Sequence, residues 1–413
     1  MKKPFPCYLA AATLLCICSM RTESQTIFST FDDFLNQHTS AIFPTEKDSL
    51  FSLFWRQALK QGIPFVDSNR NDVTFLYRGS ADSVKVYGDF TSWTFKLKMR
   101  KLLETDLFYL KLSFEQDARL DYKLIVNNQE MLDPLNKGIG PGGYGDHSEL
   151  TMPDFNRSLE LKELDKTPKG TLTTLSHSSK VLGYGHKVFV YLPVGYDTGR
   201  AQYPVVYFQD GPDYVNFAKT PTILDNMIAS KVIPPVIGVF VAPPTESTRN
   251  RATEYSLNDT YVKFFSTELI PFIDKKYRTN QTSTARYAVG ASFGGLISLY
   301  LAFTNPNQIS TAASQSGYVS FNNDTLLTMF KQSPAKPIRV YAGVGTYEKN
   351  VGGFPPGTTE GNFYRANRSF RKILGQKEYA FEYRDFHDGH SWGRWRNELP
   401  YILRWFFAPA KQK

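Results

Sequence analysis

One stretch, Arg286–Leu301, constrains the fold more than any other part of the chain; it reads RYAVGASFGGLISLYL. The apolar run Tyr287–Val289 has the length and the β-branched end of a buried strand. The apolar segment Leu296–Phe303 ends just before an Asn-Pro pair, as helices commonly do. We therefore expect a strand that turns through Gly-Ala-Ser-Phe-Gly-Gly into a helix.

The serine of this turn is a candidate nucleophile. A sharp strand-to-helix turn leaves no room for side chains at Gly290 and Gly294, and it raises the Ser292 hydroxyl at the end of the sheet. The Phe293 N–H and the positive end of the helix dipole can then stabilise a negative oxygen. An ordinary serine on a glycine-rich turn is the alternative interpretation.

A serine nucleophile needs a base. In hydrolases whose serine lies on such a strand–turn–helix unit, the partners follow along the chain in the order serine, acid, histidine. His387 and His390 are the histidines that follow the serine. They lie in a loop after the expected strand Phe381–Tyr383, and Gly389 lets this loop turn. We assign His390 as the general base and expect His387 to cap a turn.

The acid is expected after a preceding strand, where the ends of parallel strands gather the site. Ile338–Ala342 leads to Glu348, which we assign as the acid. Asp385 and Asp388 are nearer to the histidine in sequence, but an acid two residues from its histidine is sterically awkward. A backbone carbonyl as the orienting group is a further alternative.

The loop after Val205–Phe208 is expected to supply the second oxyanion donor besides Phe293. Pro212 has no N–H, so the donor is Gly211, Asp213 or Tyr214, and we favour Asp213.

Three side chains are assigned to substrate contacts: Arg251, Tyr214 and Trp392. Arg251 lies in another loop at the end of a strand, where it can bind an anionic group or pair with Glu254. The aromatic content of 15% is common where flat or sugar-like ligands are handled, although cores use these residues too.

From residue 161 to 413 apolar strands alternate with helical stretches, which predicts an α/β domain with a mostly parallel sheet covered by helices on both faces. This pattern fits the α/β-hydrolase architecture. Helices are expected near 221–230, 261–275, 295–304 and 395–407. The expected strands are Val188–Leu192, Val205–Phe208, Val236–Val241, Tyr287–Val289, Ala312–Ser314, Ile338–Ala342 and Phe381–Tyr383.

Residues 25–66 have helical periodicity, and residues 67–160 alternate with period two between turn residues. The latter pattern predicts a small antiparallel β-sandwich of the Ig-like kind. Trp93 follows one of its turns, and we interpret it as a packed turn aromatic rather than a ligand platform.

Residues 1–24 resemble an export signal, with Lys2-Lys3 before an apolar run that is too short to span a bilayer. A lipid anchor at Cys18 is the alternative to simple cleavage. All three cysteines lie in this segment, so we expect no disulfide, no thiolate metal site and no cysteine nucleophile in the mature chain. Hydrolysis by a serine and a histidine implies no metal or organic cofactor. The formal charge of +9 is dispersed, which argues against a nucleic-acid partner.

Four motifs together resemble an esterase family that includes enterochelin esterases, feruloyl esterases and S-formylglutathione hydrolases. They are Val188–Pro193 followed by Gly195-Tyr196, Tyr203–Tyr207 with Asp210-Gly211, Gly290–Gly295, and Gly389–Trp392. The resemblance covers about 170–410 and implies serine hydrolysis of carboxylic esters, with Ser292 and His390 in the family's positions. Glu348 falls where the enterochelin-esterase branch has an acidic residue. The fragment Val86–Trp93 resembles the Ig-like modules that precede such enzymes.

The expected function is hydrolysis of esters outside the cytoplasm, either feruloyl or other acyl esters of plant polysaccharide. The alternatives are a siderophore trilactone esterase, an acyltransferase and a carbohydrate-binding protein. The substrate-determining residues are expected in the loops 211–254 and 345–365.

Overall fold

The computed structural model of this protein describes residues 28–143, 145–244, 250–355 and 358–408. The chain divides into two compact units, of which one ends at Gln57 and the other runs from Ala58 to Lys413. Within the described ranges no helix is both long and apolar enough to cross a bilayer. The predicted signal segment and the alternative lipid anchor at Cys18 lie outside these residues.

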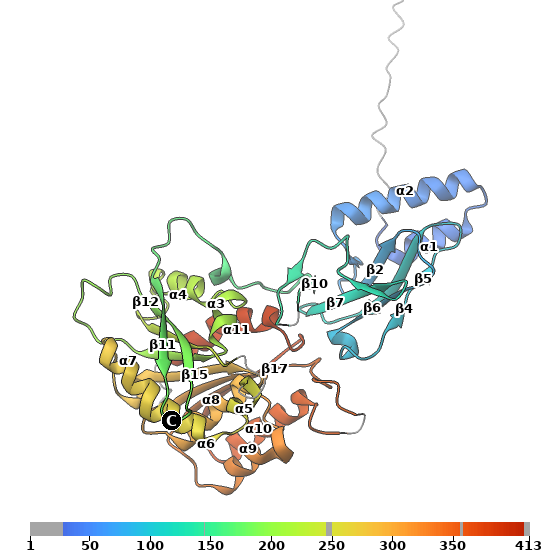
Figure 1. Cartoon of the computed structure of the whole chain (residues 1–413). Helices are drawn as coiled ribbons and strands as arrows, with labels where there is room; N and C mark the ends of the chain where they lie inside the picture. The colour runs from blue at the N-terminus through green and yellow to red at the C-terminus, as the bar shows by residue number, and fades with distance from the viewer. Residues whose placement is uncertain (1–27, 144, 245–249, 356–357, 409–413) are drawn as a thin grey trace, which may run out of the picture. The chain divides into compact units, whose positions relative to one another are not determined.

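The first unit is built on helices, as predicted. Helix α1 (Phe31–Ser40) begins at a capping box made by Thr30, and α2 (Pro44–Gln61) follows it (Figure 1). Phenylalanines from both helices form a buried cluster in which the rings of Phe34 and Phe54 stack at 4.1 Å.

Two antiparallel sheets follow, as predicted, and they share one buried core to which Phe75, Val86 and Leu124 belong. The Ig-like assignment of this β-sandwich stays a prediction. The first sheet has the order β1 (Phe65–Val66), β2 (Asp72–Arg78), β6 (Leu107–Ser113), β5 (Arg100–Lys101). The second has the order β4 (Leu97–Lys98), β3 (Val84–Gly88), β7 (Arg119–Val126), β10 (His147–Thr151), β9 (Ile139–Gly140), and β8 (Gln129–Met131) pairs with β7.

The remaining strands form one eight-stranded sheet, and the predicted strands of this region are confirmed. The first three strands in spatial order are antiparallel neighbours, and the rest pair in parallel. The order is β11 (Thr171–Ser178), β12 (Gly185–Leu192), β14 (Ile237–Val241), β13 (Val205–Gln209), β15 (Arg286–Ala291), β16 (Thr311–Gln315), β17 (Arg339–Gly345), β18 (Ala380–Phe386). The edge strand β11 is largely exposed and was not predicted, since it has few apolar residues.

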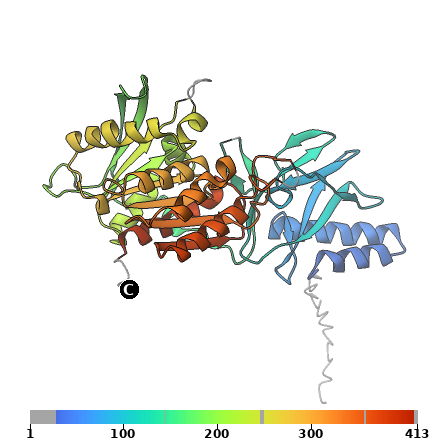
Figure 2. The ribbon, with the colours of Figure 1, turned by 90° about the horizontal axis from the view of Figure 1, so that it is seen from below.

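Helices cover both faces of this sheet (Figures 1 and 2), because alternate strand residues are apolar on each side. Val205 and Tyr207 belong to one buried cluster, whereas Val206 and Phe208 belong to the other. One face packs against α3 (Gly211–Asn216), α4 (Thr220–Ala229) and α11 (Trp392–Phe407). The other packs against α5 (Arg251–Tyr255), α6 (Asp259–Phe264), the π-turn Phe265–Leu269, α7 (Ile270–Lys276), α8 (Phe293–Thr304), α9 (Phe321–Gln332) and α10 (Phe363–Gln376). This α/β-hydrolase architecture, preceded by a small antiparallel sandwich, is the predicted fold.

Candidate active site

The turn between β15 and α8 holds Ser292 in a strained backbone conformation. Its φ is 57° and its ψ is −120°, a region that a residue with a side chain adopts only when its surroundings enforce it. Strain of this kind raises the serine hydroxyl at the end of the sheet, at the N-terminus of α8.

The glycines of the turn are required by close packing, as predicted. A Cβ at Gly290 would lie 2.1 Å from the carbonyl oxygen of Gly294, which is the first turn of the helix. A Cβ at Gly294 would lie 2.9 Å from the carboxylate Oδ2 of Asp210, which follows β13. The turn Gly290–Gly295, called the elbow below, therefore has no room for a side chain at Gly290 or Gly294.

Four neighbouring parallel strands bring polar residues to one edge of the sheet. Ser292 follows β15, Ser316 follows β16, Glu348 follows β17 and His390 follows β18. Since the strands are parallel neighbours, their carboxyl ends meet at this edge. The Ser292 N–H donates to the carbonyl of Gln315 at 2.9 Å, which ties the elbow to the end of β16.

The predicted base and acid lie in direct contact. His390 Nδ1 is 2.7 Å from Glu348 Oε2. Glu348 is 1% exposed, and its Oε1 accepts hydrogen bonds from the Gly345 N–H at 2.7 Å and the Ser316 hydroxyl at 2.6 Å. A carboxylate held in this way favours the imidazole tautomer that carries its proton on Nδ1 and leaves Nε2 as an acceptor.

The alternative acids and the second histidine face other partners. Asp385 accepts from the Tyr383 hydroxyl at 2.8 Å on an exposed strand, and Asp388 is buried against Arg119 at 3.3 Å. His387 Nδ1 contacts Asp117 Oδ1 of the sandwich at 2.6 Å. Of the three candidate acids, Glu348 is the one that forms a hydrogen bond with His390 within the described residues.

The preferred second oxyanion donor, Asp213, is not placed for that role. Its N–H donates to the Asp210 carbonyl at 3.0 Å, and the Tyr214 N–H donates to the same oxygen at 3.1 Å, because both lie in the first turn of α3. Of the three alternatives, Gly211 is the one that this turn does not exclude. Burial and the neighbouring Asp210 charge raise the pKa of the Asp213 side chain to about 6.

Arg251 does not pair with Glu254, which was one of the two roles considered for it. Its guanidinium binds both carboxylate oxygens of Asp210, at 2.6 and 2.9 Å, and donates to the Ala291 carbonyl at 3.0 Å. Glu254 instead contacts His186 Nε2 at 2.7 Å. Arg251 therefore links the loop after β13 to the residue that precedes the candidate nucleophile.

The substrate contacts assigned to Tyr214 and Trp392 are wrong. Tyr214 is 0% exposed, and its hydroxyl donates to Gln315 Oε1 at 2.7 Å. Trp392 is buried as well, with its ring edge-on to Tyr214 at 5.1 Å. Both side chains point into the core under the sheet because α3 and the first turn of α11 pack there.

Two residues beneath the acid were missed from the sequence. Ser316, at φ 48°, accepts the Trp395 indole N–H at 3.0 Å and also contacts the Arg394 guanidinium. Arg394 is buried beside Glu398, at 2.7 Å, and Glu348. Burial opposes the charge of Arg394, but these carboxylates outweigh it and raise its pKa. A charged residue inside the apolar face of α11 is the signal that could have indicated this network.

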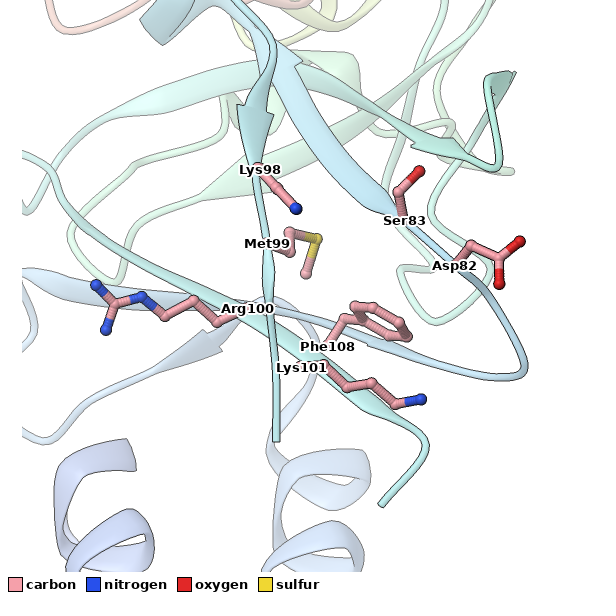
Figure 3. A pocket seen from close by; sticks show the side chains of 7 residues that line it. All are labelled: Asp82, Ser83, Lys98, Met99, Arg100, Lys101 and Phe108. Atoms are coloured by element: carbon pink, nitrogen blue, oxygen red, sulfur yellow. The ribbon is translucent and has the colours of Figure 1, made fainter. Parts of the chain in front are cut away.

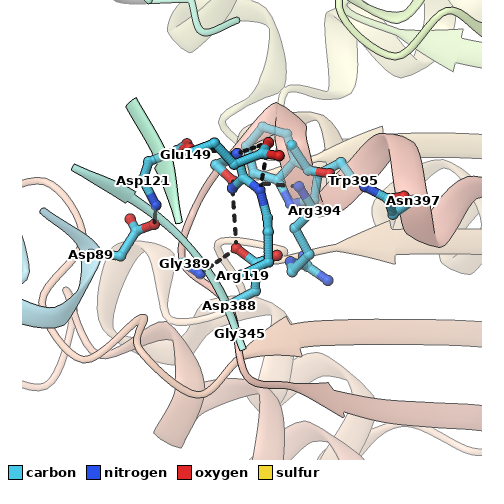
Figure 4. Close-up of polar contacts among 12 residues, drawn as sticks. Asp89, Arg119, Asp121, Glu149, Gly345, Asp388, Gly389, Arg394, Trp395 and Asn397 are labelled. Atoms are coloured by element: carbon cyan, nitrogen blue, oxygen red, sulfur yellow. Dashed lines mark hydrogen bonds and ion pairs between the residues drawn. The ribbon is translucent and has the colours of Figure 1, made fainter. Parts of the chain in front are cut away.

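Arg119 of the sandwich holds the histidine loop (Figure 4), and it too was missed. The guanidinium is fully buried and donates to the Ser391 hydroxyl at 2.7 Å and to Glu149 at 2.8 Å. It also contacts Asp121, and its backbone N–H donates to the His387 carbonyl at 3.0 Å. The alternation of polar residues through Arg119–Tyr122 on a buried strand was the available signal.

A cavity of about 440 Å³ adjoins the histidine. His390, Glu348 and Tyr347 line one part of it, and Trp93 and His147 of the sandwich line another. A second cavity, of about 650 Å³, lies on the sandwich between basic side chains and Phe108 (Figure 3) and shares no lining residue with the first. Among the described residues no cluster of His, Cys, Asp or Glu has the make-up of a metal site.

Some known proteins are similar to this chain over about half of its length, and others over most of it. An uncharacterized protein, YjcH of Bacillus subtilis, is 29% identical over 55% of this chain and 93% of its own length. The iron(III) enterobactin esterase of Dickeya dadantii is 22% identical over 86% of this chain and 92% of its own.

Two solved structures share the fold. The ferric enterobactin esterase of Salmonella typhimurium has a TM-score of 0.72 at 19% identity, covering 86% of this chain and 98% of that one. A ferulic acid esterase has a TM-score of 0.51 at 17% identity, covering 58% and 99%. The family described as "Putative esterase" matches residues 179–406, more than half of the chain. The protein therefore belongs to this esterase family.

Proposed function

We propose that this protein is a serine hydrolase of carboxylic esters. His390 Nε2 takes the Ser292 hydroxyl proton as the serine oxygen attacks the ester carbonyl, and Glu348 stabilises the imidazolium that forms. The Phe293 N–H, at the start of α8, stabilises the oxyanion together with a donor from the loop after β13, for which we propose Gly211. The carbon–oxygen bond to the alcohol breaks, and the alcohol leaves with the proton from His390.

Water completes the cycle by the same route. It gives a proton to His390 and attacks the acyl-serine, and the serine leaves with that proton as the acid is released. This reaction needs no group other than the side chains and amides named. The observation that carries the proposal is the 2.7 Å contact between His390 Nδ1 and a buried Glu348 carboxylate, at the sheet edge where Ser292 is strained.

For the substrate we propose feruloyl or other acyl esters of plant polysaccharide, met outside the cytoplasm. Three carboxylates, Asp89, Glu130 and Glu348, line the cavity beside His390, against one lysine, Lys123. Such a lining favours a neutral, hydroxyl-rich substrate over a strongly anionic one. The fold shared with a ferulic acid esterase and the export-like segment at 1–24 are consistent with this substrate class.

A second candidate, siderophore trilactone hydrolysis, is favoured by one specific observation. The iron(III) enterobactin esterase of Dickeya dadantii aligns over 86% of this chain, so the similarity includes the region before the esterase domain. An iron(III)–catecholate complex is anionic, and the cavity beside His390 has one lysine, Lys123, which is already paired with Glu130 at 2.6 Å. An iron-free trilactone would not need such a cation.

Kinetics with variants test the chemistry. We expect Ser292→Ala to abolish hydrolysis of a nitrophenyl ester, and Glu348→Gln to lower kcat by about 10²–10⁴. Asp385→Asn, an exposed carboxylate on β18 just before the loop of His390, is the matched control and should leave kcat unchanged. Wild-type turnover by the Ser292→Ala variant would contradict the proposed nucleophile.

A substrate panel then decides between the two candidates. Methyl ferulate, feruloylated arabinoxylan oligosaccharide, iron-free enterobactin and ferric enterobactin are compared by kcat/KM. We expect the feruloylated oligosaccharide to be the best substrate. Preferred hydrolysis of either enterobactin form would overturn the polysaccharide-ester assignment and support the second candidate.

A further inference from the structure

A buried hydroxyl lies beneath the candidate acid and contacts it. Ser316 directly follows β16 and is fully buried, and its hydroxyl oxygen is 2.6 Å from Glu348 Oε1. Its φ of 48° places a residue with a side chain in the left-handed region, which persists only when the surroundings enforce it. The Ser316 N–H donates to the Gly343 carbonyl at 2.7 Å, so the backbone of β17, the strand before Glu348, holds this conformation.

The direction of the Ser316 proton follows from a count of donors and acceptors. A serine hydroxyl has one proton to donate and two lone pairs that accept. The Trp395 indole N–H donates to this oxygen at 3.0 Å, and the Arg394 guanidinium donates to it as well. Indole and guanidinium groups donate hydrogen bonds and do not accept them. The proton of the Ser316 hydroxyl is therefore directed at Glu348 Oε1.

The same count orients the carboxylate of the candidate acid. Glu348 Oε1 accepts from the Ser316 hydroxyl and, at 2.7 Å, from the Gly345 N–H. Glu348 Oε2 is 2.7 Å from His390 Nδ1. Two donors thus hold one carboxylate oxygen, and the other is left to the imidazole. Hydrogen bonds to a charged acceptor are the stronger kind, and they compensate the burial of the Glu348 charge.

The guanidinium beneath Ser316 is fixed from its other side. Arg394 lies buried in the first turn of α11 and donates to Glu398 Oε2 at 2.7 Å. The side-chain amide of Gln315 donates to the same oxygen at 2.8 Å, and the Gln315 carbonyl accepts the Ser292 N–H. One buried chain of hydrogen bonds therefore joins α11, the end of β16, the acid and the histidine. Networks of this kind, when fully satisfied, fix one arrangement of their members.

We infer that Ser316 is a positioning residue of the reaction, which acts through Glu348 by turning the carboxylate so that its Oε2 orients the His390 imidazole. Arg394 is the second positioning residue, because its bond to the Ser316 oxygen fixes where the hydroxyl proton points. Both side chains are buried, so they act on the reaction from behind the acid and not by touching substrate. The inference rests on the proposed ester hydrolysis and deepens it, since it adds two residues to the machinery of that site.

A double-mutant cycle separates this role from a general effect on packing. We expect Ser316→Ala to lower kcat for a nitrophenyl ester by about 10-fold to 100-fold, the scale of one hydrogen bond to a charged group, and to change KM by less than about twofold. In the Glu348→Gln protein the same substitution should lower kcat no further, because the carboxylate that Ser316 positions is absent. A full additional loss in the Glu348→Gln protein would overturn the inference, since Ser316 would then act by another route.

Ser314→Ala is the matched control. Ser314 lies on β16, two residues before Ser316, and its buried hydroxyl has no hydrogen-bond partner among the described residues. Its kcat should equal that of the wild type. If Ser316→Ala does not melt cooperatively, Ser316→Gly takes its place in the cycle, because glycine adopts a φ of 48° without strain. An unchanged kcat in a folded variant without the Ser316 hydroxyl would overturn the inference.

A spectroscopic measurement separates this inference from the proposed function. The proton between His390 Nδ1 and Glu348 Oε2 gives a low-field proton NMR signal that is observed without substrate. We expect Ser316→Ala to shift this signal and Ser314→Ala to leave it in place. A shift in Ser316→Ala, with no ester hydrolysis by the wild type, would keep the positioning of the acid and defeat the proposed function. Ester hydrolysis by the wild type, with signal and kcat unchanged in Ser316→Ala, would defeat the positioning role alone.

Discussion

The two sides of the candidate site are built differently. The elbow around Ser292 is specified by a contiguous stretch, in which glycines admit the turn and apolar runs form β15 and α8. The loop 387–391 around His390 is fixed by the sandwich, through Arg119, whose contact with Asp388 spans 269 positions of the chain. The histidine side of the site therefore depends on the sandwich, and nothing in the serine motif Gly290–Gly295 indicates this dependence.

Adding one methyl group at Gly290 should disrupt the elbow. In Gly290→Ala the new Cβ would lie 2.1 Å from the Gly294 carbonyl oxygen, and the backbone there cannot move without shifting α8. We expect no folded protein at 37 °C, measured as loss of soluble yield and of a cooperative thermal transition. Gly375→Ala in α10 is the control, because a Cβ there has no neighbour within 4 Å. A Gly290→Ala protein that melts like Gly375→Ala would show that the elbow tolerates side chains.

Local motifs made the elbow and most of its sheet predictable. A strand, a glycine-rich turn and an apolar helix occur together within sixteen residues, and each long apolar run became a strand or a helix. The positions of Ser292, Glu348 and His390 at one edge then follow from the rule for parallel strands.

The failures involve residues whose partners are distant in sequence. Trp392 lies beside a predicted site residue but packs into the core, because the apolar face of α11 begins in its first turn. Arg251 has a carboxylate three positions away, but tertiary packing gives it Asp210 instead. Arg119 has no local signal of its contact with Asp388, since strand periodicity shows which side chains are buried and not what they meet.

The dependence of the His390 loop on the sandwich is tested by removing the guanidinium of Arg119. Arg119→Met keeps the length of the side chain but takes the contacting guanidinium from buried Asp121 and Asp388, whereas Glu149 keeps Arg157 and Arg396. We expect the free energy of unfolding to fall by about 3–5 kcal/mol. Because the loop of His390 loses its bond from Arg119 to Ser391, kcat should also fall, by about 10². Urea unfolding and ester kinetics at a temperature where the variant is folded measure the two effects.

The control for this variant is an exposed arginine of the same sandwich. Arg78 contacts Asp106 at 3.0 Å, with 39% of its side chain exposed. Arg78→Met should change stability by at most about 1 kcal/mol and leave kcat unaltered. If Arg119→Met matched this control in both measurements, the histidine loop would be independent of the sandwich, and the contrast drawn between the two sides would fail.

The smallest expected effect is a pH dependence that the histidine side alone should show. Burial and then the charge of Asp121 raise the pKa of Asp89 to about 7, against about 3.9 for an unfolded aspartate. The folded protein therefore binds this proton more tightly, so the stability from Asp89 is full below about pH 4 and is lost as the pH rises to about 7. Asp89→Asn should remove this slope, worth about 2–3 kcal/mol between pH 5 and pH 8.

Urea midpoints of wild type and variant at both pH values measure this slope, and Asp82→Asn, an exposed carboxylate of the same domain, should keep the wild-type slope. An unaltered slope in Asp89→Asn would mean that the carboxylate against Gly389 stays charged in the folded protein. The Asp89 carboxylate, which accepts the Trp93 indole N–H and packs against Gly389, would then keep its charge from pH 5 to pH 8. The contact between the sandwich and the His390 loop would not vary with pH.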